Sequence, residues 1–196
     1  MPRVVDTEKR KEEILDAALA ALDDGGFATF TMRSLGRRIG GSSTLVTHYF
    51  PSRESIIAAV IDRTVRRTAE EVERLHQVAD LRARLRAALE YFVPTSEADK
   101  QAERRRIALL AYRGIEPSVD DYYAKLEPMM RGVLSAAIDG AVPPEEAAAI
   151  LDLVRLWVNG MALSVVEHPE IWTGERQTAA LEKLLSLLPI SDAAAR

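Results

Sequence analysis

The sequence predicts an all-α protein, and three observations support that fold class. Apolar residues recur at intervals of three and four along most of the 196-residue chain, which is the spacing of one helix face. No stretch alternates apolar and polar residues in the way a half-buried strand does. Gly, Pro and potential capping residues interrupt the apolar pattern about once per helix length.

The first helix is expected to follow a loose arm of residues 1–5. Asp6 and Glu8 favour a helix start, and Gly25-Gly26 favours its end. The apolar residues between them lie on one face: Ile14, Leu15, Ala18 and Leu22. This helix therefore has one face available for a core.

Two short helices joined by a tight turn are expected next. Thr31 is a suitable N-cap for the first of them, whose Leu35 and Ile39 lie four residues apart on one face. Gly40-Gly41 breaks that helix, and Gly36 has no side chain to hold two crossing helices apart. The pattern is that of a helix-turn-helix.

The second short helix should present a polar surface. Ser42 is its expected N-cap, and the helix is expected to run to about Phe50. Three apolar or aromatic residues can face inward: Leu45, Val46 and Tyr49. The residues that remain for the outer face carry hydroxyl and imidazole groups: Ser43, Thr44, Thr47 and His48.

Charge is distributed unevenly along the chain. Residues 31–53 contain no Asp or Glu and four arginines: Arg33, Arg37, Arg38 and Arg53. Such a stretch suits a phosphate backbone, because neutralised phosphates release counterions. Residues 1–68 carry 11 Lys/Arg and 9 Asp/Glu, a net charge of +2, whereas residues 69–196 carry 15 and 21, a net charge of −6. Double-stranded DNA is therefore the expected partner of the first part of the chain.

Three motifs in this region resemble the TetR family of bacterial transcriptional repressors: TMRSLG at 31–36, GGS at 40–42 and HYFPSRE at 48–54. The resemblance covers roughly the first quarter of the chain. It implies a three-helix DNA-binding domain at residues 1–51 and a helical ligand-binding and dimerisation domain at residues 52–196. It also implies that residues 42–50 form the recognition helix.

The resemblance assigns Tyr49 and Arg53 to contacts with DNA phosphate. The sequence departs from the family pattern at Ile39, Gly41 and Thr47, where the family commonly has a small residue, valine and tyrosine. Together the pattern and the resemblance predict these DNA-binding residues: Thr31, Arg33, Ser42, Ser43, Thr44, Thr47, His48, Tyr49 and Arg53.

A long amphipathic helix over residues 52–76 is expected to connect the two domains. Ser52 is its expected cap, and its apolar stripe includes Ile56, Val60 and Ile61. Glu73 and His76 form an E-x-x-H pair of the kind that di-iron bundles use twice, but the sequence holds no second copy. The sequence therefore predicts neither a metal site nor a cofactor.

Three further helices are expected at residues 81–93, 99–113 and 119–138. With the helix that follows, they carry aromatic and thioether side chains suited to a pocket for a small-molecule ligand. The expected ligand-binding residues are Tyr91, Tyr112, Tyr122, Tyr123, Met130, Trp157 and Met161. An ordinary helical core with tyrosines at its rim explains the same residues.

The helix expected at residues 145–167 is apolar on nearly every side, with a narrow polar strip of Asp152, Arg155 and Asn159. A domain of this size can hardly bury such a helix unless a second chain helps. The helix expected at residues 177–188 adds a leucine stripe. The expected homodimer interface consists of Ile150, Val154, Trp157, Gly160, Leu181, Leu184 and Leu188.

Three function classes follow from these observations. The preferred one is a dimeric transcriptional regulator that binds a palindromic operator; its repressor sign and its release by a small-molecule ligand are implied by the resemblance. A constitutive DNA-binding protein keeps the first domain and lacks the ligand. A helical enzyme is disfavoured, since no motif sets His48, His76 or His168 beside a nucleophile and the chain has no Cys. No stretch resembles a signal peptide or a membrane span, so a cytoplasmic location is expected.

Overall fold

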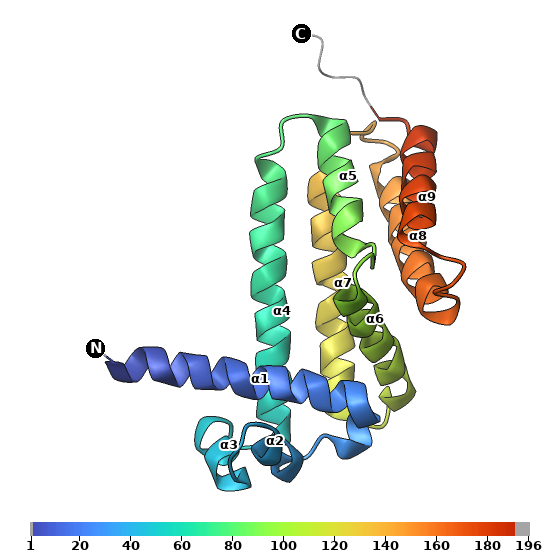
Figure 1. The fold of residues 1–196 in the computed structure, drawn as a ribbon. Coiled ribbons are helices and arrows are strands. Elements are labelled where there is room, and N and C mark those ends of the chain that lie inside the picture. Colours follow the sequence, from blue (N-terminus) through green and yellow to red (C-terminus); the bar gives the residue numbers. More distant parts are fainter. Residues whose placement is uncertain (1, 191–196) are drawn as a thin grey trace. The chain divides into compact units, whose positions relative to one another are not determined.

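The computed structural model describes the backbone of residues 2–190 and the side chains of residues 7–27 and 29–190. Within that range it consists of helices and turns without a strand (Figure 1), which confirms the all-α prediction. The elements are α1 (Pro2–Thr29), α2 (Met32–Arg38), α3 (Ser43–Tyr49), α4 (Arg53–His76), α5 (Leu81–Phe92), α6 (Glu97–Leu109), the 3₁₀ helix η1 (Leu110–Tyr112), α7 (Pro117–Ile138), α8 (Ala147–Glu167) and α9 (Gly174–Leu187).

Three helix boundaries differ clearly from the expectation. Helix α1 begins at Pro2, so most of the expected arm is helical; proline suits the first helical position, where its missing N–H is not needed. The expected stop near Gly25 is a kink at Gly26 (φ 63°, ψ −162°), after which helical turns continue to Thr29. Farther along, the helix expected at residues 99–113 ends at Leu109 and tightens into η1.

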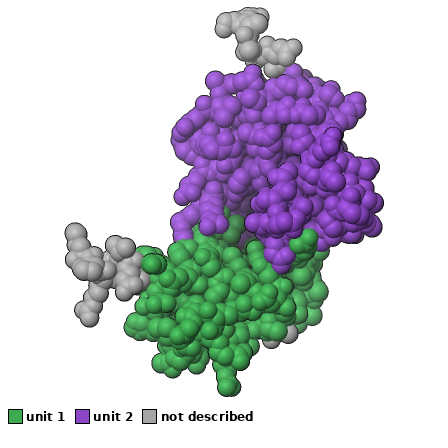
Figure 2. All heavy atoms as spheres, in the orientation of Figure 1, with its two compact units in different colours: residues 1–64, 104–123 green, residues 65–103, 124–196 purple. Residues whose placement is uncertain are grey.

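The chain forms two compact units (Figure 2). Unit 1 consists of Met1–Thr64 and Arg104–Tyr123, and unit 2 consists of Val65–Glu103 and Ala124–Arg196. The helix-turn-helix therefore belongs to a unit that also contains a segment from the middle of the sequence. The division into domains at residue 51 stays a prediction.

The core of unit 1 draws on both of its segments. Its buried residues are Ile14, Leu15, Ala18, Ala21, Phe27, Phe30, Leu35, Val46, Phe50, Ile56 and Val119. Val119, from the second segment, is fully packed, and Tyr112 places its ring 5.2 Å from that of Phe27. The second segment thus completes the core to which the helix-turn-helix contributes Leu35 and Val46.

Unit 2 is a helical body in which α5 packs against α8 and α9. Its most deeply buried side chains include Leu85 and Leu89 of α5, Val154 and Val165 of α8, and Leu185 of α9. Arg86 of α5 also forms a two-pronged ion pair with Glu182 of α9, with one N–O distance of 2.6 Å. Apolar packing and this ion pair hold α9 to α5.

Candidate nucleic-acid interface

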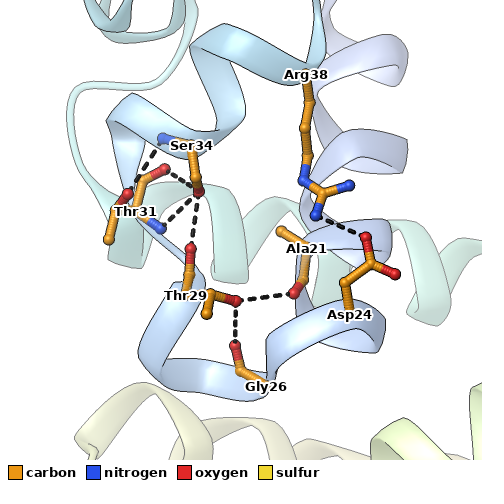
Figure 3. Close-up of polar contacts among 7 residues, drawn as sticks. All are labelled: Ala21, Asp24, Gly26, Thr29, Thr31, Ser34 and Arg38. Atoms are coloured by element: carbon orange, nitrogen blue, oxygen red, sulfur yellow. Dashed lines mark hydrogen bonds and ion pairs between the residues drawn. The ribbon is translucent and has the colours of Figure 1, made fainter.

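The junction between α1 and α2 is fixed by side-chain hydrogen bonds (Figure 3). The hydroxyl of Thr29 lies 3.2 Å from the carbonyl oxygens of both Ala21 and Gly26 and can donate to either. Thr31 and Ser34 form a reciprocal capping box: the Thr31 hydroxyl accepts from the Ser34 N–H at 3.1 Å, and the Ser34 hydroxyl accepts from the Thr31 N–H at 3.2 Å. The N-cap predicted at Thr31 is confirmed, and such a cap contributes about 1 kcal/mol.

The two helices of the motif cross at Gly36. A Cβ at this position would lie 2.5 Å from the carbonyl carbon of Ser42, 2.6 Å from its oxygen and 2.8 Å from the nitrogen of Ser43. These are backbone atoms, so no side-chain rotation can relieve the clash. Gly40, in the turn, has φ 69°, a left-handed conformation that other residues adopt only with strain. The backbone geometry therefore requires glycine at both positions.

Helix α3 turns its apolar side to the core and its polar side outward. Ser42 caps it as predicted, accepting from the Leu45 N–H at 3.3 Å, and Val46 is fully buried. The side chains predicted for its outer face are all exposed: Ser43, Thr44, Thr47 and His48. Tyr49 is half-buried and packs on the core of unit 1. A short, capped helix with a row of exposed hydrogen-bonding groups has the form of a recognition helix.

The arginines of the motif are in different electrostatic environments. Arg33 and Arg37 are exposed and form no ion pair with a residue that the structure describes. Arg38 binds Asp24 of α1 at 2.7 Å (Figure 3). Arg53 binds Glu116 at 2.9 Å, and its guanidinium lies 4.4 Å from the centre of the Phe27 ring. Arg33 and Arg37 are thus directly available to an anion, and the predicted phosphate contact of Arg53 stays a prediction.

Glu54 follows Arg53 in the first turn of α4. A hydrogen bond from a backbone amide and a second one from the Ser52 hydroxyl lower the pKa of the Glu54 carboxyl below its ordinary value. The Ser52 hydroxyl also accepts from the Ser55 N–H at 3.2 Å, so Ser52 caps α4 as predicted. An ionised carboxylate at this position stabilises the start of the helix.

The predicted ligand-binding residues are divided between the two units. Tyr112, Tyr122 and Tyr123 belong to unit 1, where the Tyr123 hydroxyl donates to the Arg106 carbonyl and the Arg113 guanidinium lies 5.3 Å from the Tyr123 ring centre. The others lie in unit 2: Tyr91 is exposed, Trp157 is half-buried, and Met130 and Met161 are buried. Their role in a ligand pocket stays a prediction.

The predicted interface residues are mostly covered by their own chain. Five of them are buried within unit 2: Ile150, Val154, Leu181, Leu184 and Leu188. Gly160 is exposed and Trp157 is half-buried. The exposed apolar side chains of α8 are instead Leu153 (54% exposed), Leu156 (70%) and Leu163 (40%). These leucines and Gly160 recur at helical spacing on the side of α8 opposite the buried Val154, Val158 and Val165. This spacing is the sequence signal that would have identified the exposed apolar row.

A hollow of about 330 Å³ lies beside these leucines on the surface of unit 2. It is lined by Glu127, Arg131, Asp152, Arg155, Leu156 and Asn159. Arg131 binds Asp152 at 2.6 Å, and Arg155 binds Glu127 at 2.7 Å. The two charged residues of the predicted polar strip of α8 are therefore paired with side chains of α7.

No group of three or more His, Asp or Glu side chains among the described residues is placed to hold a metal ion. Glu73 and His76 are exposed near the end of α4. By length and composition alone, helix α8 is long and apolar enough to span a membrane. Its paired charged strip is typical of a helix in a folded domain.

Comparison with known proteins agrees with this geometry. Residues 14–60 match the family model of bacterial regulatory proteins, tetR family. The chain is 25% identical over 169 residues to the HTH-type transcriptional regulator BetI of Burkholderia thailandensis, covering 82% of this chain and 86% of that one. Other BetI relatives match over shorter stretches, and the chain spans 58% of the length of BetI from Yersinia pestis.

Two solved structures show the same fold. A proposed transcriptional regulator from Saccharomonospora viridis, solved in complex with choline, aligns with a TM-score of 0.79 at 17% identity, covering 94% of this chain and 99% of that one. A TetR transcription regulator from Haloarcula marismortui aligns with a TM-score of 0.75 at 17% identity, covering 94% and 100%. With its capped helix-turn-helix and its match to the family model, the chain belongs to the TetR family of transcriptional regulators.

Proposed function

We propose that the protein is a homodimeric repressor that binds a palindromic operator in the major groove and is released by a small-molecule ligand. The observation that carries this proposal is helix α3, which is held to α2 at Gly36 and presents four exposed hydroxyl or imidazole side chains. Two exposed arginines on α2, which form no ion pair with any described residue, add positive charge beside it. Operator binding would place the protein in the cytoplasm of a bacterial cell.

The DNA contacts divide into two groups. Thr44 and His48, exposed on α3, are assigned to base edges, which specify the sequence. Tyr49 and Arg53, near the end of α3 and the start of α4, are assigned to phosphates, which give affinity without sequence preference. Footprinting on the DNA that flanks the gene tests the assignment. Absence of a protected palindrome there and in a selection from random DNA would contradict it.

A second copy of the chain is proposed to cover the exposed side of α8. Leu153, Leu156 and Leu163 form an apolar row on which Gly160 permits close approach, and unit 2 itself leaves this row open. Two recognition helices in such a dimer would read half-sites about 34 to 36 Å apart. A single chain would bind far more weakly, because it loses the effective concentration that tethering gives to a second site.

Analytical ultracentrifugation tests the dimer with two substitutions matched in exposure. Leu156→Glu places a charge on the α8 row, and Ile115→Glu places the same charge at an equally exposed position (70%) in unit 1. We expect a wild-type dimer, a Leu156→Glu monomer and an Ile115→Glu dimer. A wild-type monomer, or a dimer for both variants, would show that α8 is not the interface.

A small cationic ligand of the choline type is the first one to test. The support is the structural neighbour that was solved in complex with choline. Aromatic side chains such as those proposed above recognise quaternary ammonium groups through cation–π contacts. Native mass spectrometry of the purified dimer, followed by operator binding with and without choline, separates two classes. A co-purified or added molecule that lowers operator affinity supports the ligand-responsive repressor, whereas no such molecule favours a constitutive DNA-binding protein.

A further inference from the structure

The ion pair between Arg53 and Glu116 joins the start of α4 to the turn before α7. Arg53 is the first residue of α4 and follows the end of α3 by four positions. Its Nη2 donates to Glu116 Oε2 at 2.9 Å, and the two side chains are only 29% and 30% exposed. The Phe27 ring covers the guanidinium from a distance of 4.4 Å. This partial burial strengthens the pair, because solvent and salt screen it less than an exposed one.

The Glu116 backbone is held in place from both sides. Its N–H donates to the Tyr112 carbonyl at 3.0 Å, and its carbonyl accepts from the N–H groups of Val119 (2.9 Å) and Asp120 (3.2 Å). Tyr112 and Val119 both pack on the core of unit 1. The Glu116 backbone is therefore anchored, and this keeps its carboxylate within reach of Arg53.

We propose that Glu116 is an internal competitor for DNA phosphate, which holds Arg53 in the free protein and thereby lowers operator affinity. This inference rests on the proposed DNA-binding function and on the phosphate role of Arg53. A phosphate that approaches Arg53 must either displace Glu116 or share the guanidinium with it, and a carboxylate beside a phosphate repels it. Glu116 is thus a residue that sets affinity without contacting DNA.

The comparison with two other ion-paired arginines of unit 1 supports this choice. Asp24, the partner of Arg38, has a side chain that is 67% exposed, so water screens its charge. Glu12 and Asp16 bind Arg63, which lies ten residues farther along α4 and is 8% exposed in its side chain. Glu116 is the shielded carboxylate paired with an arginine assigned to phosphate.

Operator binding by the full-length dimer tests the proposal through Glu116→Gln. The substitution keeps the shape and an acceptor oxygen and removes the charge. We expect binding about three- to tenfold tighter at moderate salt, the effect of one unit charge a few ångströms from a phosphate. The slope of log K against log salt should steepen by less than one, because Arg53 then neutralises a phosphate in full instead of sharing its charge with Glu116.

Asp16→Asn is the matched control. It removes the α1 carboxylate that pairs with Arg63, which lies on the same helix as Arg53, so it changes the charge of unit 1 equally without touching Arg53. Glu116→Asp, which keeps the charge, should bind like the wild type. In the Arg53→Ala background, Glu116→Gln should have no effect on affinity or salt slope.

The outcomes separate this inference from the proposed function. Weaker binding by Glu116→Gln at an unchanged melting temperature would mean that Glu116 orients Arg53 for DNA. Equal gains in operator affinity for Glu116→Gln and Asp16→Asn would mean a general charge effect. Either result overturns the proposal. Unchanged binding by Glu116→Gln also overturns it and leaves the repressor function intact. A wild type that binds no DNA overturns both.

Discussion

Gly36→Ala is the sharpest test of the helix-turn-helix geometry. The added methyl group would lie 2.5 Å from the Ser42 carbonyl carbon and 2.8 Å from the Ser43 nitrogen. A Cβ atom essentially never lies within 3.0 Å of another non-bonded heavy atom, so α2 and α3 must separate by about half an ångström or more. The neighbours are backbone atoms of the turn and of the α3 cap, and moving them also disturbs the Ser42 hydrogen bond to Leu45.

Two opposing effects determine the size of the loss. Alanine is favoured over glycine in a helix by about 1 kcal/mol. Overpacking costs about 1 to 3 kcal/mol, and the upper end applies where backbone must move. The expected net loss in the free energy of unfolding is therefore about 1 to 2 kcal/mol. Operator affinity should fall about tenfold or more, since displacing α3 weakens several contacts at once.

Urea unfolding and fluorescence anisotropy with operator DNA measure the two effects. Gly132→Ala in α7 is the control: a Cβ there meets no atom within 4 Å, so the same change should stabilise the protein by up to about 1 kcal/mol and leave DNA binding unchanged. Equal responses at both positions would refute the assignment of Gly36 to the crossing point.

Three further predictions follow from the described contacts. Thr44→Ala should alter operator preference at particular base pairs and leave the salt slope unchanged. Arg53→Ala should weaken all sequences alike and lower the slope by less than one, because Glu116 shares the guanidinium in the wild type. Competition with mutated operators over a salt series distinguishes them. Leu184→Glu should destabilise unit 2 by several kcal/mol, because this leucine is buried in its own chain, and should therefore lower the urea midpoint of the monomeric Leu156→Glu variant as well. Glu54→Gln should make the free energy of unfolding fall less steeply as the pH is lowered. The pKa of Glu54 is lowered in the folded state, so the carboxylate contributes its full stabilisation above the ordinary value of 4.5 and loses it as pH falls through the folded pKa.

The local features of the motif could be predicted from the sequence, because they depend on residues a few positions apart. The caps at Thr31 and Ser42 each require a hydroxyl three residues before an amide, and the structure contains both bonds. The need for glycine at position 36 follows from the spacing of the two helices, and the measured distances agree with it. The burial of Val46 follows from helical periodicity.

The covering of α8 and α9 could not be predicted in the same way. Periodicity shows that Val154, Leu181 and Leu184 are buried, but it does not show whether their own chain or a second chain covers them. Helix α5, which packs on both helices, lies far from them in sequence. For the same reason, no local pattern links Glu116 to Arg53, which is 63 positions away.

The two-segment construction of unit 1 has a consequence for synthesis of the protein. The helix-turn-helix emerges early from the ribosome, but Tyr112 and Val119, which cover its core, emerge only after residues 65–103 have been made. Bringing the two segments of unit 1 together closes a long loop and costs chain entropy, which only the contacts between the segments offset. The tertiary structure of unit 1 should therefore form slowly relative to its individual helices. A nascent chain that ends before residue 104 would expose part of the apolar surface around Phe27, which is the kind of surface that chaperones bind. The newly made protein would therefore gain its full affinity for DNA only after more than half of the chain has been translated.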